Sequence, residues 1–206
     1  MTVTRLRYVF RDFSSRVLPF ALAAFVCGVS FWQTTTALEG EDEAFWRMLR
    51  FTGGEIESYD GLQDMADAAD LVVHGTLRNM RLGRTVGRDM SVGTVSFTVV
   101  DVDAIEMIRG ETRNAVQVEL TIPWRVESSA DVARMADLLP KGEVLLFLRH
   151  KQDGVGGYRL VNRAGLWSEN KGGLRAPLAD AQEGARLGGE VATIASVVQL
   201  AEYVRK

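Results

Sequence analysis

The N-terminal leader of this chain limits how much of the sequence can join a globular fold. Four arginines lie before residue 17: Arg5, Arg7, Arg11 and Arg16. An uncharged, strongly apolar run then extends from Val17 to Trp32. A basic flank before an apolar segment directs a chain into or across a membrane and stays on the cytoplasmic side. We therefore expect the rest of the chain to fold outside the cytoplasm.

The leader has two possible fates. Residues 17–38 are uncharged, and a helix of this length rises about 33 Å, enough to span the hydrocarbon core of a bilayer. This arithmetic predicts a single-pass membrane anchor with an extracytoplasmic C-terminal domain. Alternatively, Thr35 and Ala37 supply the small residues that precede a signal-peptide cleavage site, and the mature protein would then be secreted. The sequence leaves both alternatives open.

The single cysteine excludes a disulfide framework. Cys27 lies within the apolar run, so the exported part has no cysteine to pair. The residue before it is Val26 rather than the small residue of a lipoprotein signal, so we do not expect lipidation. The exported domain must therefore be stabilised by core burial.

Charge and length bound the remaining residues. Residues 38–206 contain 20 Lys and Arg against 26 Asp and Glu. An acidic surface repels phosphate backbones, so no nucleic-acid partner is expected, and this length predicts one domain. We divide the chain into a leader at 1–37, a helical linker at 38–68 and a β-rich globular domain with a C-terminal helix at 69–206.

Apolar residues at helical spacing predict four short helices. They lie within residues 39–57, 59–69, 128–139 and 196–205. The first begins after an acidic triplet, and it either packs on the domain or lies on the membrane surface. The third begins with Ser128 and Asp131 at the spacing of a capping pair. We expect the tryptophans beyond the leader, Trp46, Trp124 and Trp167, to lie in the core or at its rim.

Segments rich in β-branched and apolar residues predict a sheet. The expected strands are 71–77, 95–108, 116–122, 143–150, 158–162 and 165–168, with 143–150 at the centre. The turn-rich residues 81–89 predict a hairpin between the first two strands. Gly75 predicts a bulge or a close backbone approach, and the adjacent Val99 and Val100 predict a bend or bulge near Val100. The fold class is mainly β (α+β): a small, curled antiparallel sheet or OB-like barrel with peripheral helices.

Part of this order of elements resembles a known family. The segments concerned are 69–77, Ile108-Arg109-Gly110, 142–148 and 158–161. They resemble uncharacterised exported bacterial proteins with a netrin-like or metalloproteinase-inhibitor-like OB barrel, over residues 69–167. The resemblance implies a small β-barrel. This chain lacks the cysteines of such inhibitors, including the N-terminal cysteine that chelates a protease metal, so inhibition by that route is not implied.

Few side chains suggest catalysis. The histidines are His74 and His150, and no nucleophile elbow, zinc-protease, P-loop or dinucleotide motif is present. The pattern places His74 within a strand, where it is a weak ligand-binding candidate and more typical of a hydrogen-bonded strand residue. His150 follows a buried strand and is typical of a solvated strand end. Asp101 and Asp103 share one face of a strand, but one pair supplies too few oxygens for a hard cation, so we predict no metal and no cofactor.

A group of arginines gives the other binding candidates. Arg78, Arg81, Arg84 and Arg88 lie close together in sequence, where they could meet anionic headgroups or an acidic partner. A solvated hairpin tip explains the same pattern. Of these, Arg81, Arg84 and Arg88 join His74 as ligand-binding candidates.

These observations favour a non-catalytic binding or interaction module outside the cytoplasm, held at the membrane by residues 17–38 or secreted, with a protein or small ligand as its partner. An extracytoplasmic hydrolase is the alternative, and it requires His74 and Asp101 to converge in one pocket. A structural envelope component is a third possibility, and it predicts a domain without a cavity or an exposed apolar patch.

Overall fold

The computed structural model describes residues 43–50, 57–86, 95–122, 128–153 and 156–206. Residues 40–206 form one compact unit. The expected membrane segment, Cys27, the cleavage candidates Thr35 and Ala37, Arg88 and Trp124 lie outside the described residues. Within the described ranges, no helix combines the length and the apolar character needed to cross a membrane.

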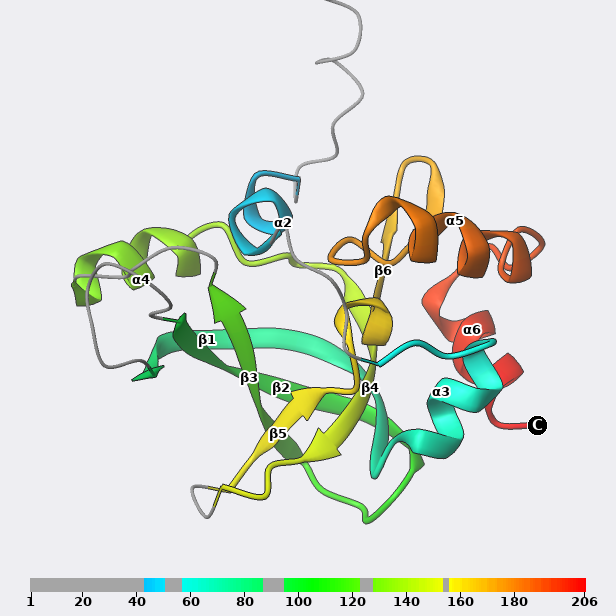
Figure 1. Ribbon diagram of the computed structural model, residues 1–206, viewed down its shortest axis with the longest axis horizontal. Coiled ribbons are helices and arrows are strands. Elements are labelled where there is room, and N and C mark those ends of the chain that lie inside the picture. Colours follow the sequence, from blue (N-terminus) through cyan, green and yellow to red (C-terminus); the bar gives the residue numbers. More distant parts are fainter. Residues whose placement is uncertain (1–42, 51–56, 87–94, 123–127, 154–155) are drawn as a thin grey trace, which may run out of the picture. The chain divides into compact units, whose positions relative to one another are not determined.

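The described residues form a mainly β, α+β fold around one seven-stranded sheet (Figure 1). The strands are β1 Leu71–Val86, β2 Val95–Arg109, β3 Ala115–Ile122, β4 Glu143–His150, β5 Tyr158–Leu160, β6 Leu166–Asn170 and β7 Gly173–Arg175. The helices are α2 Glu43–Leu49, α3 Leu62–Ala68, α4 Ser129–Ala136, α5 Ala181–Glu190 and α6 Val197–Val204. The strand order is β1-β2-β3-β5-β4-β6-β7, and β1 also pairs with β4.

Several expected elements are confirmed. The alternating segment at 116–122 is β3, and the apolar run at 143–150 is β4, which pairs with β1, β5 and β6 and is therefore central. The hydroxyl of Ser128 accepts a hydrogen bond from the backbone N–H of Asp131, as the capping pair predicts. Strand β7 and helix α5 are additions that the sequence pattern did not predict, because both are short of apolar residues at a clear period.

The prediction of a turn at 81–89 is wrong for its first half. Strand β1 continues to Val86 and pairs with β2 throughout. Gly83 lies where the register shifts, and a Cβ there would lie 2.7 Å from the carbonyl oxygen of Phe97. The close backbone approach therefore requires glycine. The arginines and glycine of this segment are typical of a turn. They also fit an exposed two-stranded ribbon, because such a ribbon needs no alternation of apolar and polar residues.

The predicted bend or bulge near Val100 is confirmed as a bulge, because the register shifts between Arg78 and Met80, which pair with Asp101 and Val100. Residues Ser96, Thr98, Val100 and Val102 are all buried on one face, so β2 keeps its phase there. The extra residue lies on the opposite strand, at Asn79, whose φ of 40° is in the left-handed region that asparagine tolerates. Gly75 also lies at a register shift, and a Cβ there would collide with the carbonyl oxygen of Asp103, which confirms the predicted close approach.

The sheet is not wholly antiparallel, which corrects the prediction. Strands β3 and β5 pair in parallel at Val118 with Tyr158 and at Glu119 with Arg159. This parallel pairing is short. Strand β5 also pairs with β4, in the antiparallel direction. Helix α4 lies in the chain between β3 and β4.

Two apolar clusters pack on the two faces of the sheet. Alternate residues of β1 contribute to each: Val73 belongs to the first cluster and Val72 to the second. Phe45, Trp46 and Leu49 of α2 are buried in the first cluster, so this helix packs on the domain. The second cluster includes Trp167 and residues of α3, α5 and α6, which lie together at one side of the sheet (Figure 1).

Candidate functional site

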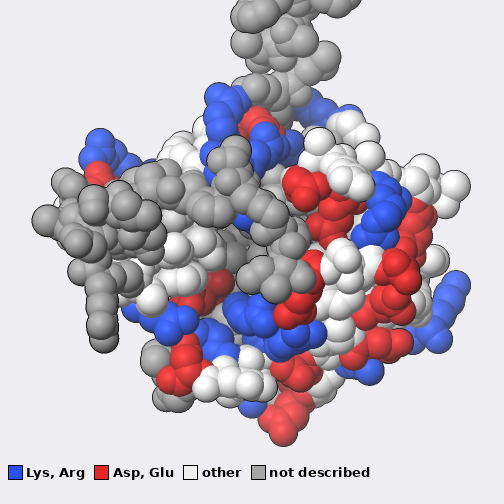
Figure 2. Space-filling view, in the orientation of Figure 1, with Lys and Arg blue, Asp and Glu red and all other residues white. Residues whose placement is uncertain are grey.

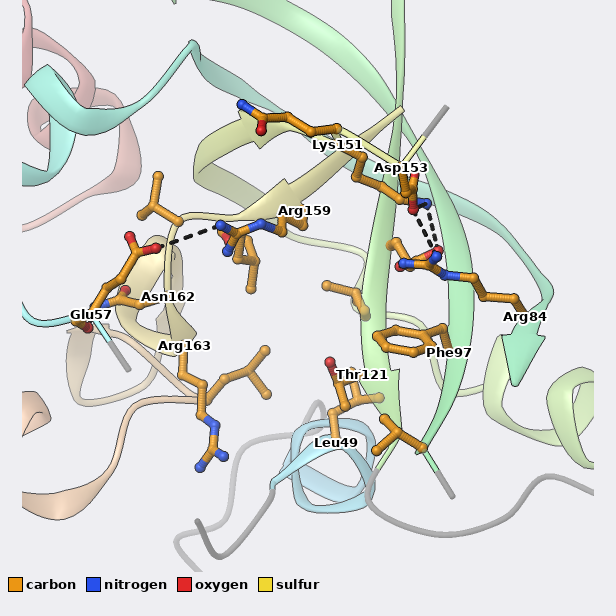
Figure 3. A pocket seen from close by; sticks show the side chains of 17 residues that line it. Leu49, Glu57, Arg84, Phe97, Thr121, Lys151, Asp153, Arg159, Asn162 and Arg163 are labelled. Atoms are coloured by element: carbon orange, nitrogen blue, oxygen red, sulfur yellow. Dashed lines mark hydrogen bonds and ion pairs between the residues drawn. The ribbon is translucent and has the colours of Figure 1, made fainter. Parts of the chain in front are cut away.

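The candidate site is a cavity of about 770 Å³ beside β2, β3 and β5 (Figure 3). This volume is typical of small-molecule sites. The described lining residues are Leu49, Glu57, Arg84, Val95, Phe97, Glu119, Leu120, Thr121, Lys151, Gln152, Asp153, Arg159, Leu160, Val161, Asn162, Arg163 and Leu178. Strands, one helix and the loop after β4 therefore contribute to one site.

The phase of β2 and β3 decides which side chains face the cavity. Val118, Leu120 and Ile122 belong to the first core cluster, so Glu119 and Thr121 point to the other face of β3. Phe97 lies on the corresponding face of β2, because Thr98 is buried on the core side and pairs with Leu120. The outer faces of β2 and β3 therefore contribute to the cavity, together with Leu120 and Leu49 of the first core cluster.

Apolar side chains form much of the lining. They come from several parts of the chain: Val95, Phe97, Leu49, Leu160 and Leu178. The guanidinium of Arg84 lies 5.1 Å from the centre of the Phe97 ring, within the range of a cation–π contact. The cavity can therefore receive an apolar group.

One wall of the cavity carries a cluster of paired charges, Arg84, Glu119, Lys151 and Asp153, of which Glu119 and Lys151 are buried. The Lys151 ammonium lies 2.7 Å from a Glu119 carboxylate oxygen, and both side chains are only 7% exposed. Arg84 bridges Glu119 at 3.0 Å and Asp153 at 2.7 Å. Lys151 also lies 3.4 Å from Asp153. Two cations face two carboxylates, so this cluster neutralises itself.

The opposite wall carries a second group around Glu57 (Figure 3). Arg149 donates to both Glu57 oxygens, at 3.0 and 2.8 Å, and the Tyr59 hydroxyl donates at 2.7 Å. The Tyr59 hydrogen bond, followed by the positive charges of Arg149 and Arg159, holds the pKa of Glu57 below its usual value. Burial and the Glu57 carboxylate raise the pKa of Tyr59. At neutral pH Glu57 is therefore charged and Tyr59 is protonated.

The structure places the sequence candidates in different environments. His74 is buried, and its Nε2 lies 2.8 Å from a carboxylate oxygen of Glu143. Arg81 donates to Asp101 at 2.7 Å on the β1–β2 ribbon. Of the candidates among the described residues, Arg84 alone lines the cavity, and it does so from a strand rather than from a hairpin tip.

The geometry required for a hydrolase at His74 and Asp101 is not present. Asp101 is in register with Arg78, four residues beyond His74 on β1, which corresponds to about 13 Å along the strand. Neither side chain lines the cavity. Asp103 does not join such a site either. Its carboxylate accepts a hydrogen bond from Arg78 at 3.2 Å. Within the described residues, no group of three or more His, Cys, Asp or Glu side chains is placed to hold a metal ion.

Sequence reasoning missed most of the cavity. Lys151 and Asp153 directly follow the apolar strand β4. This position could have indicated binding residues, because loops at strand ends often carry them. Glu119 had a weaker signal, as a charged residue in an otherwise well-defined half-buried strand. Nothing in the sequence connects Glu57 with Arg159, which are 102 residues apart and meet only in the fold.

Charges of both signs are interspersed over the described part of the face in Figure 2. Basic and acidic residues there do not separate into two areas. The pattern agrees with the paired charges that line the cavity.

No family model matches this chain, and a search of curated proteins found no match.

Proposed function

We propose that the chain is an extracytoplasmic, non-catalytic binding module built on an OB-type barrel. The pairings of β1 with β2, β2 with β3, β3 with β5, β5 with β4 and β4 with β1 support this barrel. The helix between β3 and β4 agrees with it, as does the resemblance of residues 69–167 to netrin-like proteins. In OB folds the face of the second and third strands and the loop between the fourth and fifth bind ligands.

The observation that carries this function is the position of the cavity. Phe97 of β2, Thr121 of β3 and Lys151 in the loop between β4 and β5 all line it. Its mixture of apolar surface with a few converging polar groups is typical of ligand sites. The same cavity argues against a purely structural envelope component, for which no such hollow is needed.

The leader supports the proposed location. We propose that residues 17–38 anchor the protein in the membrane with the domain on the extracytoplasmic side, and that cleavage after Ala37 is the alternative. The mass of the purified mature protein distinguishes them. The full-length mass supports the anchor, whereas loss of residues 1–37 supports secretion.

Capture experiments with a cavity-filling variant test the binding function. The tagged full chain is purified from a membrane fraction, and its partners are identified by mass spectrometry. Thr121→Trp places a large ring in the cavity, and Val198→Trp changes an exposed α6 residue that does not line it. We expect the partner retained by wild type and Val198→Trp to be lost from Thr121→Trp, with circular dichroism unchanged. Equal capture by all three proteins contradicts a role for the cavity.

A further inference from the structure

The charge of Arg159 in the cavity is only weakly matched by the described residues around it. It projects from β5, its side chain is 46% exposed, and its ion pair with Glu57 is 3.6 Å long (Figure 3). Among the described residues, the guanidinium also donates a hydrogen bond to the carbonyl oxygen of the adjacent Leu160, at 3.3 Å. Glu57 is already engaged by Arg149 and Tyr59 at shorter distances. The Arg159 guanidinium therefore retains donors for another anion.

The strand register adds to this charge. Arg159 pairs directly with Arg149 of β4 and with Glu119 of β3. Like charges at paired positions are destabilising. Glu119 does not relieve them, since its two oxygens bind Arg84 and Lys151. Among the described residues Arg149 and Arg159 thus share the single carboxylate of Glu57, and a ligand anion can match the positive charge that this leaves.

We infer that Arg159 binds the anionic end of a small amphipathic carboxylate whose apolar body lies against Leu160, Leu49 and Phe97. This inference rests on the proposed function, because it requires the cavity to be a ligand site. A guanidinium presents a planar pair of donors that matches a carboxylate. The apolar lining accounts for the rest of the ligand, and the cavity volume suits a small molecule.

Two fluorescent probes of similar shape separate the charge from the apolar surface. 8-Anilinonaphthalene-1-sulfonate carries an anionic group, and N-phenyl-1-naphthylamine is its neutral counterpart. Each is titrated into the folded full chain, into Arg159→Gln, and into the control Arg78→Gln, which removes an exposed arginine outside the cavity lining. Circular dichroism establishes that all three proteins are equally folded.

We expect Arg159→Gln to weaken binding of the anionic probe about tenfold, the loss of one charge-assisted contact. Binding of the neutral probe should stay within about twofold, as one lost charge is irrelevant to it. Arg78→Gln should bind both probes like wild type. Unchanged affinity of Arg159→Gln for the anionic probe overturns the inference while leaving the binding module intact. Failure of wild type to bind either probe contradicts the proposed function itself.

Competition identifies the source of the carboxylate. Decanoate represents an acyl chain, and acetyl-trileucine represents a peptide C-terminus. Displacement of the anionic probe by either one, and not by decanol, supports a carboxylate ligand and names its source. Failure of both carboxylates to displace the probe overturns the assignment of a carboxylate.

Discussion

The charged residues on the two walls of the cavity differ in how deeply they are buried and in how completely they are paired. On one wall, Lys151 and Glu119 are almost fully buried, and with Arg84 and Asp153 they form a neutral cluster. On the other wall, Glu57 faces two arginines, and its side chain is 35% exposed. A buried charge requires a close partner because its desolvation is costly. A solvated charge can remain partly unmatched.

This difference assigns different tasks to the two walls. The cluster of Arg84, Glu119, Lys151 and Asp153 joins the loop after β4 to β1 and β3, so it holds the shape of the cavity. In the group around Glu57, the guanidinium of Arg159 stays in contact with solvent inside the partly apolar cavity. We therefore expect substitutions on the first wall to change stability most, and substitution of Arg159 on the second wall to change ligand binding.

Lys151→Met gives the largest expected effect. The substitution leaves the carboxylate of Glu119 buried with Arg84 as its remaining partner, and breaking a buried pair in this way costs about 3 kcal/mol. Urea unfolding followed by tryptophan fluorescence measures the loss. The double variant Lys151→Met with Glu119→Leu removes both charges and should recover much of the stability. A loss below about 0.5 kcal/mol for the single variant would place this pair with ordinary surface pairs.

Glu57→Gln gives a smaller loss of stability. The substitution removes the carboxylate that Arg149 and Arg159 share. Because this group is partly solvated, we expect a loss of about 1 kcal/mol at pH 7. Glu57→Ala tests whether the effect comes from the charge: it should resemble Glu57→Gln if the ion pairs dominate.

The loss caused by Glu57→Gln should depend on pH. The pKa of Glu57 is lowered in the folded protein, so its contribution is present above the unfolded value near 4.5. It disappears as the pH falls through the lower folded pKa. The difference in stability between wild type and Glu57→Gln should therefore shrink below about pH 4.5. A difference that is equal at pH 7 and at pH 3 would contradict the charged contact.

The sequence was sufficient for elements whose burial follows a simple period. Val116, Val118 and Leu120 alternate with polar residues, and β3 forms where the alternation predicts it. The pattern failed in β2, where Phe97 and Val99 alternate with Ser96 and Thr98, yet the polar pair is the buried one. Both faces of this strand are partly covered, one by the core and one at the cavity, so hydropathy alone does not give its orientation.

The cavity could not be predicted because its residues meet through long-range pairing. The parallel pairing of β3 with β5 brings Glu119 beside Arg159, although the two segments are separated by α4 and β4. The arginines grouped in the sequence were the more visible signal, and Arg78 and Arg81 instead pair with Asp103 and Asp101 on the ribbon. An arginine's function depends on which carboxylates the fold places beside it, and local sequence does not contain that information.

Arg159→Gln should change stability least, although it alters the same wall as Glu57→Gln. The variant loses a long ion pair and also the like-charge neighbour of Arg149. These two effects oppose each other, so we expect the free energy of unfolding to stay within about 0.5 kcal/mol of wild type in urea. A loss as large as that of Glu57→Gln would mean that Arg159 supports the fold, and the contrast between the two walls would fail. An unchanged stability would agree with a guanidinium that serves ligand binding rather than the fold.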